Sequence, residues 1–400
     1  MDSFVNQILH FGCSSSLYVF GLTAIIGFTY YYLTSVVEEP KLHCKDGDFK
    51  KFLYQHVPLT KKHIWPLALG FGPGLNTVIA FCVRYLFVPS VKYDRELLDL
   101  KDGGHVALDT LQPNENSING DVTILVMPGF GNSSQSGYVR AASLALQKSG
   151  YRVVVFNYRG VGGLKLKTPR SFTGHDLEDV TEVVNHVKQK YPKTILGGLG
   201  ISMGCTLLGV YMCSNEQYTH KRLSAAMFLS APWNAHSIAS SMSKNITGRM
   251  TDLAMTRYMI NSYVKSNSKV LNCPNQKWNY NDVIKCKTGV EFFRNYTIKM
   301  LGYNTVEDYF DSVSLHDKID RFNIPCLCLS AADDPLVSDI PVEQASTTEN
   351  VAILLTARGG HIGFFENFRP FSEKEEFMIC IIRQYFDAIF KNDNYKKFTN

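Results

Sequence analysis

From about residue 120 onward, short β-branched runs alternate with stretches whose apolar residues recur at helical spacing. The predicted strands are 122–127, 152–157, 194–201, 225–230, 326–331 and 351–356. The predicted helices are 136–149, 176–190, 205–213 and 370–390. This alternation predicts a mainly parallel sheet with helices on both faces, because parallel strands need crossover connections. The functional residues of such a sheet are expected beyond the carboxyl ends of its strands.

The alternation lapses between 231 and 320, where the chain is polar and enriched in Met, Tyr and Asn. We predict that this stretch forms helices inserted over the sheet edge as a lid. The predicted division is a membrane anchor (1–40), juxtamembrane and N-terminal elements of the catalytic domain (41–118), two halves of its core (119–230 and 321–392) and the lid (231–320). A chain of 400 residues suits one large domain with extra segments.

The composition is that of an ordinary globular protein, with 45% hydrophobic and 19% charged residues. The net charge of +5 is spread along the chain, so no nucleic-acid partner is predicted. The ten cysteines form no C-x-x-C pair and no zinc-type spacing, and neither a metal nor a cofactor is predicted. Cys326 and Cys328 lie two apart in an apolar run, which predicts one face of a buried strand.

An uncharged apolar segment precedes these elements, since no Lys, Arg, Asp or Glu occurs between Asp2 and Glu38. The helix predicted over 17–37 spans the roughly 30 Å hydrocarbon core of a bilayer. A cleaved signal peptide fits less well, because no basic residue precedes the run and no small-residue cleavage site follows it. We therefore predict a single-pass anchor in the endoplasmic reticulum or the plasma membrane.

The lysines around this anchor are distributed unevenly. None precedes it, and four follow it closely, namely Lys41, Lys45, Lys50 and Lys51. The positive-inside bias would place the catalytic domain in the cytosol. A second apolar stretch, 65–88, is interrupted by Pro and Gly and contains Arg84. It predicts a helix packed on the core, and the alternative is a membrane-touching segment near a substrate entrance.

The sequence Gly200-Ile201-Ser202-Met203-Gly204 stands between the third predicted strand and a predicted helix. G-x-S-x-G in that context presents a nucleophilic Ser on a tight turn, where flanking glycines let the backbone approach closely. The alternative is a Gly-rich turn with an ordinary hydroxyl. The position between an apolar strand and a helix favours Ser202 as a nucleophile, with Gly200 and Gly204 completing the elbow.

A Ser hydroxyl needs a base, and proteins with such an elbow carry the Ser, the acid and the His in that order. His361 follows the last predicted strand in a Gly-Gly-His loop and is the predicted general base. Asp333 and Asp334 follow strand 326–331 and compete for the role of the acid. Adjacent residues point in different directions, so one of them reaches the imidazole, and we predict Asp334.

An oxyanion hole needs two backbone N–H groups aimed at the developing charge. Met203, directly after the nucleophile, is one predicted donor, and Phe130, in the loop after the first predicted strand, is the other. Glycosylation sequons begin at Asn132, Asn245 and Asn295. A glycan on Asn132 would crowd the predicted site, so we discount that sequon.

Together these residues resemble a known family, the membrane-anchored α/β-hydrolase-domain lipases. That family includes a medium-chain phosphatidylcholine phospholipase and a monoacylglycerol lipase, and yeast ethanol acyltransferases are more distant relatives. The matching stretches are 157–161, 168–170, 200–204, 332–337 and 359–364. The resemblance implies an α/β-hydrolase fold, glycerolipid ester cleavage through an acyl-enzyme, and a triad of Ser202, Asp334 and His361.

Two features depart from the family pattern. Where the family often has a G-H-x-Q-T stretch, this chain reads Pro73-Gly74-Leu75-Asn76-Thr77, so the role of that His is not carried over. The family is usually drawn with a lumenal catalytic domain, which conflicts with the lysine bias. The side of the membrane therefore stays open.

We expect a serine hydrolase that cleaves carboxylic esters of a phospholipid or a monoacylglycerol. The expected partners are this lipid ester and the membrane. Acyl transfer to an alcohol is an alternative that uses the same three residues. A non-catalytic lipid-binding membrane protein on the same scaffold is the second alternative.

Overall fold

The computed structural model describes residues 18–66, 73–113, 121–214, 222–274, 276–337, 339–366 and 376–398. Within these ranges one sheet has nine strands in the order β1-β9-β8-β7-β6-β4-β5-β3-β2. They are β1 (Lys41–His43), β2 (Asp94–Asp99), β3 (His105–Leu111), β4 (Val122–Met127), β5 (Arg152–Asn157), β6 (Ile195–Ile201), β7 (Ala225–Leu229), β8 (Cys326–Ala331) and β9 (Val351–Thr356). Strands β4 to β9 run parallel, whereas β1, β2 and β3 pair antiparallel at the two sides. The predicted, mainly parallel sheet is confirmed.

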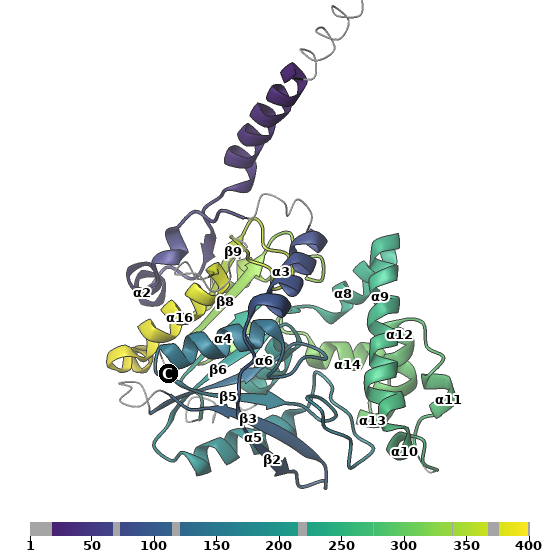
Figure 1. The fold of residues 1–400 in the computed structure, drawn as a ribbon. Helices are drawn as coiled ribbons and strands as arrows, with labels where there is room; N and C mark the ends of the chain where they lie inside the picture. The colour runs from purple at the N-terminus through teal and green to yellow at the C-terminus, as the bar shows by residue number, and fades with distance from the viewer. Residues whose placement is uncertain are drawn as a thin grey trace, which may run out of the picture.

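Helices cover both faces of this sheet (Figure 1). One face carries α2 (Asp48–His56), α4 (Gly137–Lys148) and α16 (Phe377–Phe390), and the other carries α5 (Leu177–Lys190) and α6 (Met203–Ser214). Of the helix predicted over 370–390, residues 370–375 lie outside the described residues.

Strand β8 shows why both faces need cover, because all six of its residues are buried. Leu327 and Leu329 join the core beneath α4 and α16, while Cys326 and Cys328 join the core beneath α5 and α6. The prediction that the two cysteines share one buried face is confirmed. Continuous apolar strands of this kind are typical of parallel sheets with helices on both sides.

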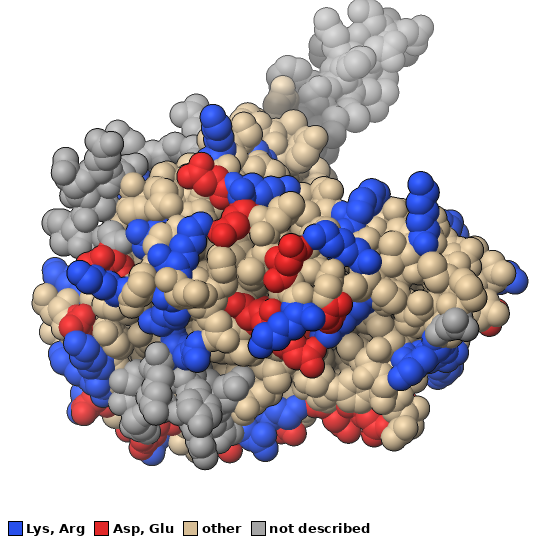
Figure 2. Space-filling model, turned by 90° about the horizontal axis from the view of Figure 1, so that it is seen from below, with Lys and Arg blue, Asp and Glu red and all other residues tan. Residues whose placement is uncertain are grey.

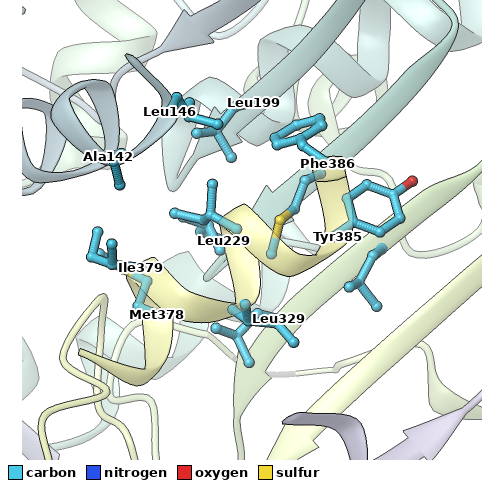
Figure 3. Close-up of a cluster of buried hydrophobic side chains, with 14 of the residues drawn as sticks. Ala142, Leu146, Leu199, Leu229, Leu329, Met378, Ile379, Tyr385 and Phe386 are labelled. Atoms are coloured by element: carbon cyan, nitrogen blue, oxygen red, sulfur yellow. The ribbon is translucent and has the colours of Figure 1, made fainter. Parts of the chain in front are cut away.

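Figure 3 shows the core where α4 and α16 meet β6, β7 and β8. Met378, Tyr385 and Phe386 of α16 are fully buried there. The Tyr385 hydroxyl donates a hydrogen bond to the Pro325 carbonyl at 2.8 Å, so its polar atom is satisfied inside the core. Each large apolar side chain buried in this way contributes about 1.5–3 kcal/mol. This layer holds the parallel strands in register below their carboxyl ends.

An insertion of short helices separates β7 from β8 and lies to one side of the sheet (Figure 1). Its helices are α8 (Ala235–Lys244), α9 (Ile246–Met259), α10 (Ser268–Leu271), α11 (Tyr280–Val283), α12 (Gly289–Phe292), α13 (Ile298–Leu301) and α14 (Val306–Val313). The side chains of Asn234 and Asn245 accept hydrogen bonds from the first turns of α8 and α9. The insertion occupies the segment where the sequence predicts a lid.

A long apolar helix, Tyr18–Val36, leaves the body of the molecule (Figure 1). This helix has a mean hydropathy of 1.4 over its most apolar 18 residues, of which 6% are buried. Among the described residues, it is the one helix that is long and apolar enough to cross a membrane. Residue 17, the start of the predicted anchor helix, lies outside the described residues. The second apolar stretch contains α3 (Pro73–Phe87), which packs its Ala80 and Val83 against Phe365.

Candidate active site

Ser202 occupies the tight turn between β6 and α6, with a φ of 53° in the left-handed region. A non-glycine residue seldom adopts this conformation, and its strain is typical of a nucleophile elbow. The Ser202 N–H donates to the Leu229 carbonyl at 2.8 Å, and the Ser202 carbonyl accepts from the Cys205 N–H at 2.8 Å. These bonds hold the hydroxyl at the carboxyl edge of the sheet.

The two glycines of the elbow allow backbone contacts that a side chain would prevent. A Cβ atom on Gly200 would lie 2.7 Å from the Cys205 Cα, and one on Gly204 would lie 1.9 Å from the Met127 carbonyl oxygen. Both distances are shorter than van der Waals contact allows. The elbow therefore packs directly against the end of β4.

The His361 ring lies between a hydroxyl and a carboxylate, at the end of the loop that follows β9. Its Nε2 atom is 2.8 Å from the Ser202 Oγ, and its Nδ1 atom is 2.9 Å from the Asp334 Oδ2. The side chains of His361 and Asp334 are 10% and 1% exposed. This arrangement lets the hydroxyl donate to Nε2 while Nδ1–H donates to the carboxylate.

The neighbouring Asp333 has a different set of partners. Its Oδ1 accepts hydrogen bonds from the N–H groups of Gly359 and Gly360, at 2.9 and 2.8 Å. Asp334 faces the imidazole and also accepts from the Leu336 N–H at 2.9 Å. Of the two candidates in the sequence, the structure places Asp334 at the His361 ring, and Asp333 holds the loop that presents the ring.

The His361 loop has a strained backbone, since Ile362 and Phe364 have φ values of 58° and 48°. Two hydroxyl groups fix it from neighbouring elements. The His361 N–H donates to the Thr77 Oγ1 of α3 at 2.9 Å, and the Ile362 N–H donates to the Ser230 Oγ at 3.1 Å. Thr77 belongs to the stretch where the chain departs from the family pattern.

Arg84 of α3 holds the same loop by donating hydrogen bonds to backbone carbonyl groups of the loop. Its Nη1 donates to the Ile362 carbonyl at 2.5 Å, and its Nη2 donates to the Gly363 carbonyl at 2.7 Å and to the Glu376 carboxylate at 2.7 Å. The Arg84 and Glu376 side chains are 3% and 1% exposed, so this is a buried ion pair whose donors are satisfied. The sequence analysis missed this role. The sequence feature that could have indicated it is a lone Arg in an apolar helix, because a buried cation needs a charged or polar partner.

The predicted oxyanion donors lie beside Ser202. Met203 is the first residue of α6, and the N–H groups of a helix's first turn have no partner within the helix. A Cβ atom on Gly129 would lie 3.2 Å from the Ser202 Cβ, so the loop after β4 reaches the nucleophile. The Gly129 N–H donates to the Tyr138 hydroxyl at 2.9 Å. Within the described chain the next N–H, that of Phe130, has no acceptor and remains available to a ligand.

An apolar cavity of about 160 Å³ lies between the sheet edge and the inserted helices. Phe130 and Met203 line it from the core side, next to the nucleophile. Its opposite wall is largely apolar and includes Met242, Met255 and Met259. Methionine side chains adapt to irregular apolar ligands. Among the described residues, no group of three or more His, Cys, Asp or Glu could hold a metal ion.

A buried carboxyl group lies behind the cavity wall to which Thr173 and Gly174 belong. Burial, together with the nearby Asp179 carboxylate, raises the pKa of Asp176 to about 7 against the opposing effects of Arg170 and Thr173. The Asp176 Oδ2 accepts from the Thr173 N–H at 2.5 Å, and its Oδ1 lies 3.7 Å from the Arg170 guanidinium. This group is separate from the contacts between Ser202, His361 and Asp334.

A nucleophile elbow at the carboxyl edge of a mainly parallel sheet, with a His–Asp pair beside it, defines the class of α/β-hydrolases. The family model described as serine aminopeptidase, S33, matches residues 119–352. The chain belongs to this family of the α/β-hydrolase fold, and the predicted fold class is confirmed.

Curated relatives match along most of the chain. Human phospholipase ABHD3 is 31% identical over 380 residues, which cover 92% of this chain and 90% of that protein. Mouse monoacylglycerol lipase ABHD2 is 27% identical over 379 residues, which cover 89% of this chain and 87% of that protein. An esterase from Pyrococcus furiosus is similar in structure, with a TM-score of 0.47, 16% identity, and coverage of 76% of this chain and 91% of that one. The predicted resemblance to membrane-anchored α/β-hydrolase-domain lipases is confirmed.

Proposed function

We propose that this protein hydrolyses carboxylic ester bonds of glycerolipids through an acyl-enzyme. One observation carries the proposal, namely the unbroken path of hydrogen bonds from the Ser202 Oγ through the His361 ring to the Asp334 carboxylate, at 2.8 and 2.9 Å. Ser is a weak nucleophile unless a base lies within hydrogen-bond reach, and here the base is in place and is itself oriented by a third group.

The first half of the reaction forms the acyl-enzyme. The Ser202 Oγ attacks the acyl carbonyl carbon while the His361 Nε2 takes the hydroxyl proton. Asp334 holds the ring in the required tautomer and stabilises the imidazolium. The N–H groups of Phe130 and Met203 donate to the oxyanion. When the intermediate collapses, the ester C–O bond breaks, and His361 returns the proton to the leaving alcohol.

The second half releases the fatty acid. His361 takes a proton from a water molecule, whose oxygen attacks the acyl-enzyme carbonyl. The bond to the Ser202 Oγ then breaks, and the proton on His361 passes to that oxygen. If an alcohol replaces the water, the same steps transfer the acyl group to it.

Three observations support a lipid as the substrate. The apolar cavity beside Phe130 and Met203 suits an acyl chain. Relatives that match nine-tenths of the chain are named a phospholipase and a monoacylglycerol lipase. The helix Tyr18–Val36 would hold the enzyme at a membrane, where such lipids concentrate. We infer a single-pass location in the endoplasmic reticulum or the plasma membrane, with a phospholipid or a monoacylglycerol as substrate.

A fluorophosphonate probe tests the nucleophile on the full-length chain in membranes. The wild type should be labelled and Ser202→Ala should not, whereas Ser243→Ala, on an exposed part of α8, should label as the wild type does. Fatty-acid release from phosphatidylcholine and monoacylglycerol, measured with and without ethanol, then separates hydrolysis from acyl transfer. Labelling that survives Ser202→Ala would refute the proposal, and tight lipid binding without turnover would favour a non-catalytic role.

A further inference from the structure

Helix α3 has an apolar outer face that the rest of the described chain leaves exposed. Its large side chains on this face are 48% to 70% exposed, and they are Leu75, Val78, Phe81, Tyr85, Leu86 and Phe87. The charged residue within α3 is Arg84, and its side chain points inward. The outer face therefore carries no charge over four turns of helix. Contiguous exposed apolar surfaces of this kind mark interaction sites.

The opposite side of the molecule has a different surface. Figure 2 shows the face seen from below in Figure 1, away from the helix Tyr18–Val36, and Lys, Arg, Asp and Glu side chains are scattered over it. Water solvates such a surface well. The outer face of α3 differs from this surface, because its exposed side chains are apolar.

The segment that precedes α3 in the chain contacts the predicted anchor. The Tyr32 ring, near the end of the anchor helix, lies 6.4 Å from the ring of Trp65, centroid to centroid. The Tyr32 hydroxyl donates to the Pro66 carbonyl at 2.5 Å. Trp65 is 49% exposed, and aromatic side chains of this kind favour the membrane–water boundary. Figure 1 shows α3 on the same side of the sheet as the anchor.

We propose that the outer face of α3 rests in the interfacial layer of the bilayer that the helix Tyr18–Val36 spans. The occupant of this face is lipid and not a second copy of the chain, because the apolar helix that would span the bilayer leaves the molecule on the same side of the sheet as α3. A helix that lies in this layer buries its apolar side at the boundary of the acyl chains and keeps its polar contacts on the other side.

The inner side of the same helix reaches the active site. Thr77 and Arg84 hold the backbone on both sides of His361, at N–H and carbonyl groups respectively. The helix that lies on the lipid thus also supports the general base of the proposed function. This geometry places the ester-cleaving site beside the membrane surface.

Photocrosslinking tests the contact without any reference to activity. The full-length chain is reconstituted in phosphatidylcholine vesicles that contain a dialkyl ether phospholipid with a diazirine in one alkyl chain. Crosslinks are expected in Tyr18–Val36 and in α3, and none in β2, whose exposed Leu97 serves as an apolar control on the far side. Labelling of the anchor but not of α3 would overturn the proposal, as would crosslinks that join the α3 helices of two chains.

An activity measurement tests whether the lipid contact of α3 matters for cleavage of membrane substrate, and this measurement rests on the proposed function. Phe81→Lys and Tyr85→Lys should lower the hydrolysis of vesicle phospholipid about tenfold and leave the hydrolysis of a soluble short-chain ester in the same vesicles unchanged. Leu97→Lys should change neither. Equal loss on both substrates, or loss on neither, would count against a lipid contact. A wild type that cleaves neither ester would refute the proposed function and leave the crosslinking result standing.

Discussion

At the scale of single residues, the site depends on close contacts that few side chains permit. Ser202, Asp334 and His361 are named by the sequence in the order that the fold requires, and the structure brings their polar atoms within 2.8 to 2.9 Å. Asp334 was predicted over its neighbour Asp333, although the sequence alone does not give the direction of either side chain, which the backbone of the turn sets. The supports Thr77, Arg84 and Ser230 were not foreseen, since their contacts join segments more than a hundred residues apart.

The two neighbouring carboxylates should respond differently to removal of their charge. Asp334→Asn is expected to lower turnover about 10⁴-fold, because the amide favours the wrong imidazole tautomer. Asp333→Asn keeps an oxygen for the N–H groups of Gly359 and Gly360 and should lower turnover about tenfold or less. Ester hydrolysis by both purified variants measures this, and equal losses would contradict the assignment.

Gly204 offers a test of the elbow itself. In Gly204→Ala the new methyl would lie 1.9 Å from the Met127 carbonyl oxygen, so the turn must move. We expect fluorophosphonate labelling to fall at least about tenfold, because small displacements at a reacting centre are costly. Gly47→Ala, where the added methyl meets nothing closer than 4.0 Å, is the matched control. Normal labelling of Gly204→Ala would show that the elbow tolerates a side chain.

At the scale of helices and strands, an element could be predicted where its own residues, and not distant partners, determine its conformation. Strands β4, β5, β8 and β9 have the predicted bounds, because a strand buried on both faces is a continuous apolar run. The edge strands β1 and β2, and β3 beside β2, were not predicted. β1 has three residues and pairs with β9, far along the chain. β2 is mostly exposed, carries alternating charges and pairs with the next strand, β3, which in turn pairs with β5.

The ion pair on the inner face of α3 allows stability and catalysis to be separated. Arg84→Met should destabilise the protein by about 3–5 kcal/mol, because Glu376 is left buried without a partner. The double variant Arg84→Met/Glu376→Met should recover much of that stability, since the uncompensated charge is gone. Its ester hydrolysis should stay low, because the carbonyls of Ile362 and Gly363 remain without their donor. Thermal unfolding and turnover of the same preparations test both statements, and full recovery of turnover would exclude a positioning role for Arg84.

At the scale of the whole molecule, one buried carboxyl group links folding to pH. Burial raises the pKa of Asp176 to about 7 from its ordinary value of 3.8, so the folded state holds a proton that the unfolded state has lost. The raised pKa adds to the free energy of unfolding, and this contribution is fully present below pH 3.8 and is lost as the pH rises to about 7.

Asp176→Asn removes this titration and keeps an acceptor for the Thr173 N–H. We expect the Tm of the variant to exceed that of the wild type by about 5 °C more at pH 8 than at pH 5. Thermal unfolding in detergent micelles at the two pH values measures the difference. An identical offset at both values would mean that Asp176 ionises normally.

The link between the anchor helix and the sheet is short, since four residues separate Val36 from Lys41, the first residue of β1. With the proposed anchor in the bilayer, an enzyme on so short a tether searches in two dimensions, and its encounter rate depends on the substrate density in its own membrane. Adding inert lipid to each vesicle should slow turnover, whereas diluting the whole suspension with buffer should leave turnover per enzyme unchanged.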